Sequence, residues 1–264
     1  MDQAHLYLAT LALSLGVFAL LWPVSLLLRD VSIVDAWWGP GFLGVAAVAW
    51  GMGDGGARST IILILVGAWA LRLGGVMLRR RLRHGAEDSR YISVRRSWGR
   101  GFWWKSLFIV FILQGVLQWL ISLTAAAGAL APPTRIGVIG AAGALLAAAG
   151  FLIEAISDAQ LDRFKLRARP DQLLTTGLRR HVRHPSYTGE MLFWWGIWLI
   201  AAEAGAWWSV VSPLILTFLL TRVSGAPMTG AGLEASKPGY AAWSARTPAF
   251  LPRLLRRDRP GGRS

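Results

Sequence analysis

Residues 6–28 read LYLATLALSLGVFALLWPVSLLL and contain no charged side chain. A helix needs about 20 predominantly apolar residues to cross the hydrocarbon core of a bilayer, which is roughly 30 Å thick. This stretch therefore predicts a membrane-spanning helix. Because no basic segment precedes it and no small-residue cleavage site follows it, we expect a retained span rather than a signal peptide.

The remainder of the chain continues this pattern. Of the 264 residues, 54% are hydrophobic and only 16% are charged, and the mean hydropathy is +0.45. Seven apolar stretches are candidates for membrane spans, namely residues 6–28, 37–50, 60–78, 102–123, 136–156, 191–202 and 207–220. The second and sixth are short, so each is either re-entrant or extended by its flanking aromatic residues. We predict an all-α protein, a polytopic membrane bundle of about seven transmembrane helices.

Basic residues gather in alternate loops of this arrangement. The formal net charge is +14, and arginines and lysines concentrate at residues 79–105, at 163–183 and from 222 onward. Because cytoplasmic loops are enriched in Lys and Arg, we expect a multi-pass protein of the inner (plasma) membrane with its N-terminus outside and its C-terminus inside. A single membrane-embedded domain is expected at residues 1–252, followed by a basic, disordered tail at 253–264.

Composition excludes several other classes of protein. The positive charge could indicate nucleic-acid binding, but no zinc-finger, homeodomain or RNA-recognition motif accompanies it. Membrane lipids are therefore the expected partners, and nucleic acid is not. The chain has no cysteine, which excludes disulfides, thiolate metal sites and a cysteine nucleophile.

The segment Arg183-His184-Pro185-Ser186-Tyr187-Thr188-Gly189-Glu190 joins a basic loop to the sixth span. Its proline favours an extended conformation at His184, so that the imidazole, the Arg183 guanidinium and the Tyr187 hydroxyl can converge near the start of the next helix. Glu190 lies at the water–lipid boundary, where a carboxylate favours a helix N-terminus and can bind an arginine or a ribose hydroxyl. The segment predicts an anion-binding active site at the membrane surface.

Two carboxylates precede this segment on the fifth span. Glu154 and Asp158 are four residues apart and therefore share one face of a helix. With the nearby cations Lys165, Arg179 and Arg183 they are suited to a nucleotide, whose hydroxyls the carboxylates and whose phosphates the cations would bind. A solvated salt-bridge face is the alternative. No metal site is expected, because no histidine pair lies near them.

Charged residues also occur near the first three spans. Arg72 lies inside the third span, where an unpaired charge costs about 2.5–3.5 kcal/mol or more, so it requires a partner. Asp35, at the start of the second span, is a candidate for that partner, and a helix N-cap is the alternative role for its side chain. The segment Glu87-Asp88-Ser89-Arg90-Tyr91 either pins the first inner loop or contacts a ligand.

These segments together resemble the steroid 5α-reductase-like membrane enzymes, in particular a bacterial branch whose substrate is poorly defined. The resemblance covers most of the chain, through residues 35–42, 87–91, 157–160, 183–190, 224–227, 237–240 and 247–252. The Arg-His-Pro-x-Tyr motif alone is less specific, since isoprenylcysteine carboxyl methyltransferases and sterol reductases have similar ones. The resemblance implies a seven-helix fold and hydride transfer from NADPH to a carbon–carbon double bond conjugated to a carbonyl, in a lipophilic substrate such as a steroid or isoprenoid.

The resemblance also implies roles for individual residues. Cofactor binding would fall to about residues 136–252, through Glu154, Asp158, Lys165, Arg179, Arg183, His184, Tyr187, Glu190, Arg222 and Tyr240. Two positions depart from the family: Ser186 replaces the usual asparagine, and Trp69 aligns with the tyrosine that reductases direct at the substrate carbonyl. The proton donor is therefore expected to be Asp35, if burial keeps it protonated, with Tyr91 and Tyr187 as alternatives.

Two other functions are compatible with the sequence. A membrane methyltransferase of the isoprenylcysteine carboxyl methyltransferase type would use the same loop to hold the carboxylate of S-adenosylmethionine. A non-catalytic lipid-binding or assembly protein would keep the scaffold without turnover, and the tryptophan at position 69 favours that alternative. Titration with each cofactor separates these functions.

Overall fold

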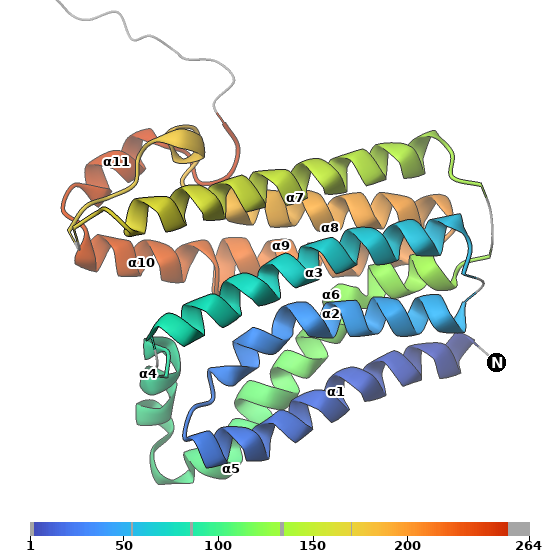
Figure 1. Cartoon of the computed structure of the whole chain (residues 1–264), viewed down its shortest axis with the longest axis horizontal. Helices are drawn as coiled ribbons and strands as arrows, with labels where there is room; N and C mark the ends of the chain where they lie inside the picture. Colours follow the sequence, from blue (N-terminus) through green and yellow to red (C-terminus); the bar gives the residue numbers. More distant parts are fainter. Residues whose placement is uncertain (1–2, 54, 85–86, 133–134, 170, 253–264) are drawn as a thin grey trace, which may run out of the picture. The chain divides into compact units, whose positions relative to one another are not determined.

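The computed structural model describes residues 3–53, 55–84, 87–132, 135–169 and 171–252 (Figure 1). The α-helices are α1 (Gln3–Leu28), α2 (Ile33–Met52), α3 (Ala57–His84), α4 (Ser89–Trp98), α5 (Phe102–Ser106), α6 (Leu113–Leu130), α7 (Val138–Lys165), α8 (Pro185–Glu203), α9 (Val211–Phe218), α10 (Ala226–Ser236) and α11 (Tyr240–Arg246). Short 3₁₀ or π-helical segments are η1 (Gly99–Gly101), η2 (Leu107–Ile112), η3 (Gly177–Arg180), η4 (Trp207–Val210) and η5 (Leu219–Val223). None of the described residues lies in a strand, so the predicted all-α class is confirmed. The predicted tail at 253–264 lies outside the described residues.

Six helical stretches of the described chain are long and apolar enough to cross a membrane. They are Ala4–Leu28, Ile33–Met52, Ala57–Leu82, Ser89–Leu130, Val138–Lys165 and Trp207–Ser236. The second predicted span is thus longer than residues 37–50 at both ends. The sixth predicted span, residues 191–202, lies in α8, which is not among the six.

The described residues divide into two compact units. Unit 1 comprises the described part of Met1–Ala148 together with Trp194–Leu216. Unit 2 comprises Ala149–Phe193, as far as it is described, together with the described part of Thr217–Ser264. The boundary passes through α7, α8 and α9, so each of these helices contributes residues to both units.

In unit 1, α2 packs against α1, α3 and α6 (Figure 1). Its approach to α3 is close because Gly39 has no side chain: a Cβ atom there would lie 2.3 Å from the carbonyl oxygen of Ala70. Phe42, Trp69 and Trp194 are fully buried and form an aromatic cluster in which the ring centroids are 5.3, 5.0 and 5.4 Å apart. Trp69 is therefore a core residue of this unit.

In unit 2, the second half of α7 and the first half of α8 cross in direct backbone contact. A Cβ atom at Gly150 would lie 2.5 Å from the carbonyl oxygen of Gly189, and one at Gly189 would lie 2.6 Å from the carbonyl oxygen of Gly150. Small residues at such crossings allow helix backbones to approach closely. The crossing brings the first half of α8 beside the second half of α7, and these two helix halves carry five of the ten predicted cofactor-binding residues.

Candidate functional site

A carboxylate and a phenol meet in unit 1. The Tyr91 hydroxyl donates a hydrogen bond to Oδ1 of Asp35 over 2.6 Å, and Nη2 of Arg90 donates to Oδ2 of the same carboxylate over 2.7 Å. Tyr91 is buried, with 9% of its surface exposed. Because both oxygens of Asp35 accept hydrogen bonds, the arrangement suits an ionised acid. Two of the three predicted catalytic residues are thus in direct contact.

Two further side chains extend this contact. Nε2 of Gln114, in α6, donates a hydrogen bond to the Tyr91 hydroxyl oxygen over 2.9 Å, and Oε1 of Gln114 accepts one from the indole Nε1 of Trp38. Neither Gln114 nor Trp38 was predicted as a site residue. The sequence does contain a signal for Gln114, because an amide inside an apolar span usually hydrogen-bonds to another polar group.

The segment that carries Tyr91 is fixed against the turn before α2. Asp88 accepts a hydrogen bond from the backbone nitrogen of Arg90 over 2.9 Å and thereby caps α4. Glu87 accepts hydrogen bonds from the backbone nitrogen of Val31 over 2.9 Å and from the Arg95 guanidinium over 2.7 Å. The prediction that this segment holds the first inner loop in place is therefore confirmed.

These contacts correct two expectations for Asp35. Ser32 occupies the N-cap position of α2, and Asp35 lies inside the first turn of the helix. The cation in contact with Asp35 is Arg90 of α4, rather than Arg72. Sequence spacing could not identify this pair, because the two residues are 55 positions apart and belong to different helices.

All ten predicted cofactor-binding residues belong to unit 2, and one of them, Tyr187, is also the third predicted catalytic residue. The loop before α8 is held there by the segment that follows α11. The backbone nitrogen of Arg183 donates to the carbonyl oxygen of Pro248 over 2.8 Å, and that of His184 donates to the carbonyl oxygen of Ala249 over 3.0 Å. The two motifs at residues 183–190 and 247–252 therefore form one structure.

His184 is buried between two other rings and is only 4% exposed. Its ring stacks on Tyr187, with centroids 5.5 Å apart and an interplanar angle of 20°, and its centroid lies 5.8 Å from that of Phe250. Burial, followed by the positive charges of Arg179 and Arg183, lowers the pKa of His184 to about 4. The imidazole is therefore neutral at physiological pH, and the positive charge of this loop comes from its arginines.

Ser186 joins the two helices that cross in unit 2. Its hydroxyl lies 2.8 Å from Oγ of Ser157 and donates a hydrogen bond to Oδ1 of Asp158 over 3.1 Å. α8 begins at Pro185, and proline is favoured at the first position of a helix because no hydrogen bond is lost there. The serine in the next position therefore orients the Asp158 carboxylate.

Three polar atoms of unit 2 are buried and have no hydrogen-bond partner in the part of the chain that the structure describes. They are Nε of Arg179, Nε of Arg183 and the hydroxyl oxygen of Tyr240. Burial lowers the pKa of Arg179, and the neighbouring Tyr187, Asp158 and Tyr240 act in the opposite direction. Buried polar groups are normally paired, so these atoms are suited to contact a polar ligand.

A family model with the description "Protein of unknown function (DUF1295)" matches residues 21–247. The chain belongs to this family. No curated protein and no solved structure matches the chain. Every candidate catalytic and cofactor-binding residue of this DUF1295 protein lies within the matched range.

The remaining predicted residues of this DUF1295 protein have different environments. The Tyr187 hydroxyl lies 2.9 Å from Oγ1 of Thr229 in α10. Glu154 is 3% exposed, and Glu190 is half-buried on α8. Lys165 and Arg222 have exposed side chains. The structure therefore groups Asp158, Arg179 and the tyrosines of unit 2, whereas Lys165 and Arg222 lie on the surface of that unit.

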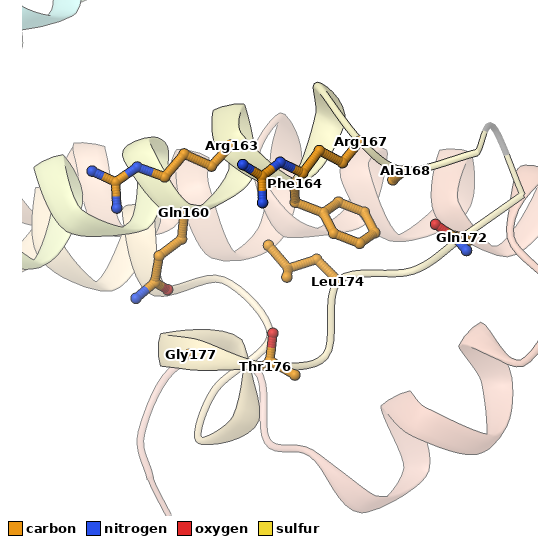
Figure 2. A pocket seen from close by; sticks show the side chains of 9 residues that line it. All are labelled: Gln160, Arg163, Phe164, Arg167, Ala168, Gln172, Leu174, Thr176 and Gly177. Carbon is orange, nitrogen blue, oxygen red and sulfur yellow. The ribbon is translucent and has the colours of Figure 1, made fainter.

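A pocket of about 410 Å³ lies between the last turns of α7 and the segment that follows it (Figure 2). Its lining residues are Gln160, Arg163, Phe164, Arg167, Ala168, Gln172, Leu174, Thr176 and Gly177. Oε1 of Gln160 accepts a hydrogen bond from the backbone nitrogen of Leu178 over 2.9 Å, which holds the two walls together. None of the predicted cofactor-binding residues lines this pocket.

Proposed function

We propose that this protein is an NADPH-dependent membrane reductase of the steroid 5α-reductase-like group. It would reduce a carbon–carbon double bond conjugated to a carbonyl in a lipophilic substrate of the steroid or isoprenoid class. The observation that carries the proposal is the grouping of Asp158, Arg179, Arg183 and Tyr240 in unit 2, where three buried polar atoms have no partner within the described residues. The proposal includes seven transmembrane helices in the inner (plasma) membrane, with the N-terminus outside and the C-terminus inside.

The residues of unit 2 fit the chemistry of a phosphorylated dinucleotide. Arg179 and Arg183 would donate hydrogen bonds to phosphate oxygens, since the guanidinium group matches that geometry. Asp158, oriented by Ser186, would accept a hydrogen bond from a ribose hydroxyl. The buried Tyr240 hydroxyl would bind a further polar group of the cofactor. When bound, NADPH would supply the hydride.

Tyr91 is the residue best suited to supply the proton. Hydride addition to the β-carbon of an enone leaves an enolate, which must gain one proton to give the saturated product. Transfer of the Tyr91 proton would leave a phenolate. The hydrogen bond from Gln114 would stabilise that phenolate, and so would the Arg90 guanidinium, which lies 5.5 Å from the ring centroid.

Asp35 is a positioning residue in this proposal. A carboxylate that is ion-paired with Arg90 has no proton to donate, but it accepts a hydrogen bond that holds the Tyr91 side chain in place. The Tyr91 proton would leave this hydrogen bond when it passes to the enolate. This assignment differs from the sequence-based preference for Asp35 as the donor. The difference rests on the two hydrogen bonds that Asp35 accepts.

Titration of the purified protein with NADPH and, separately, with S-adenosylmethionine tests the function. We expect saturable binding of NADPH and none of S-adenosylmethionine, and oxidation of NADPH when a lipophilic enone is added. Binding of S-adenosylmethionine alone would support the methyltransferase alternative. Binding of neither compound would support a non-catalytic lipid-binding protein.

A further inference from the structure

The pocket beside α7 combines positive charge with an apolar lining. Arg163 lines it from the last turn of α7 and Arg167 from the turn that follows this helix, and Figure 2 shows Leu174 and Thr176 on the segment that faces them. Phe164 and Leu174 supply the apolar part, and Leu174 is 8% exposed. The lining contains no carboxylate, so the pocket is suited to an anion that carries an apolar group.

The two arginines are not neutralised within the protein. Neither Arg163 nor Arg167 forms a hydrogen bond or ion pair through its side chain with any residue that the structure describes. The neighbouring Arg169, which does not line the pocket, pairs instead with Asp171 over 3.8 Å. The charge of the pocket is therefore available to a ligand.

An exposed apolar stripe leads along α7 to this pocket. Leu152 is 56% exposed and Ile156 is 48% exposed. At 3.6 residues per turn, both lie within about 20° of Arg163 around the helix axis. Arg167 lies in the turn that directly follows the helix. Because this stripe belongs to the span Val138–Lys165, lipid chains beside it would place their headgroups near the two arginines.

We propose that this pocket binds the phosphate headgroup of an anionic phospholipid. The guanidinium groups of Arg163 and Arg167 would bind the phosphate oxygens, and the polar side chains of Gln172 and Thr176 could bind headgroup hydroxyls. An anionic lipid fits better than a zwitterionic one, because the lining carries two positive charges and no negative charge. The proposal is independent of reductase activity, because none of the predicted cofactor-binding residues lines the pocket.

Native mass spectrometry of the full-length protein in detergent tests this site. The protein is titrated with phosphatidylglycerol and, in parallel, with phosphatidylcholine, and we expect tighter retention of phosphatidylglycerol. The variants Arg163→Gln and Arg167→Gln should each weaken phosphatidylglycerol binding about five- to tenfold. Arg169→Gln makes the same change of charge outside the pocket and should leave binding unchanged. Thermal unfolding of each variant checks that the protein is folded.

Competition identifies the source of the phosphate. Neither inorganic phosphate nor NADPH, added in excess, should displace phosphatidylglycerol from the unmodified protein. Displacement by NADPH would assign the pocket to the cofactor site, and displacement by inorganic phosphate would assign it to a soluble anion, so either result would overturn the proposal. An equal loss of binding in Arg169→Gln would also overturn it, because the attraction would then come from the basic surface in general.

Discussion

The Tyr91 hydroxyl and the Asp35 carboxylate share a 2.6 Å hydrogen bond across 56 positions of sequence. The contact links the first turn of α2 to the first turn of α4. Arg90 binds the other oxygen of the carboxylate, and Gln114 binds the phenol. Tyr91 and Asp35 have different roles in the proposed reduction, so single substitutions separate these roles.

The first prediction concerns Tyr91. Tyr91→Phe removes only the hydroxyl, and general acid catalysis typically contributes about 10²- to 10⁴-fold to a rate. We expect the single-turnover rate of NADPH oxidation with an enone to fall at least about 100-fold, while the affinity for NADPH stays within about twofold. The matched control is Tyr7→Phe in α1, which removes a hydroxyl far from this network in sequence and should leave the rate unchanged.

Asp35→Asn tests the positioning role in the same assay. The asparagine can still accept the hydrogen bond of Tyr91, so the rate should fall less than in Tyr91→Phe. The midpoint of thermal unfolding should fall slightly, because a half-exposed ion pair such as that with Arg90 contributes up to about 1 kcal/mol. Normal turnover in Tyr91→Phe, combined with lost turnover in Asp35→Asn, would make Asp35 the donor instead.

The second prediction concerns the cofactor. Arg183→Ala and Asp158→Ala should each weaken NADPH binding about ten- to hundredfold, because a charge-assisted hydrogen bond contributes about 1.5–3 kcal/mol. Ser186→Ala should have a smaller effect in the same direction, since its hydroxyl only orients Asp158. Arg169→Gln, at an exposed ion pair, serves as the control. Unchanged NADPH affinity in folded Arg183→Ala and Asp158→Ala would exclude both residues from the cofactor site.

The third prediction concerns the pH dependence of stability. His184 has a pKa of about 4 in the folded protein and 6.5 when unperturbed, so the unfolded chain binds its proton first as the pH falls. The free energy of unfolding should therefore fall between pH 6.5 and pH 4, by up to about 3 kcal/mol from this residue alone. His184→Gln should flatten the profile in that window, as measured by thermal unfolding in detergent. An unchanged profile in folded His184→Gln would contradict this prediction.

The long apolar helices were the most predictable part of the structure. A backbone in lipid must satisfy its hydrogen bonds within a helix, so long apolar stretches identify helices directly. The positions of Glu154 and Asp158 on one face of α7 follow in the same way from helical spacing. The segment at residues 183–190 was recognisable because its basic and aromatic side chains directly precede an apolar stretch, although α8 already begins at Pro185.

Contacts between distant segments were not predictable from one sequence. From the sequence alone, Arg90 was assigned to a loop. Arg72, which lies inside a span, was therefore the expected ion-pair partner of Asp35. Gln114 and Trp38 join the network only because α2 and α6 pack together. Likewise, the rings of His184 and Phe250 lie close together only because the segment that follows α11 returns to the loop before α8. Periodicity describes each helix alone and contains no information on these pairings.

The fourth prediction concerns the crossing of α7 and α8. Gly189→Ala would place a Cβ atom 2.6 Å from the carbonyl oxygen of Gly150 and 2.7 Å from the backbone nitrogen of Glu154, and backbone atoms cannot move aside easily. Such overpacking typically costs about 1–3 kcal/mol. We expect a lower midpoint of thermal unfolding and weaker NADPH binding. Gly232→Ala in α10 meets no atom within 4 Å and should be neutral or slightly stabilising.

The fifth prediction concerns whether α8 crosses the membrane. Its 19 residues rise about 1.5 Å each, which gives about 28 Å, close to the thickness of the hydrocarbon core. Tyr187 and Glu190, in its first turns, can remain at the interface while residues 191–202 cross. Crossing by α8 gives seven spans, and the basic segments at 79–105 and 163–183 then lie on the same side of the membrane as the C-terminus.

Reporter fusions at Gly55, Asp171 and Gly262 test this topology. With seven spans, the fusion at Gly55 should report the outside, and those at Asp171 and Gly262 should report the inside. If α8 does not cross, Gly262 moves to the same side as Gly55, whereas Asp171 stays inside in both cases and serves as the control. A C-terminus outside would also separate the basic residues beyond position 222 from those of the inner loops, contrary to the positive-inside rule. The result at Gly262 therefore decides between six and seven spans.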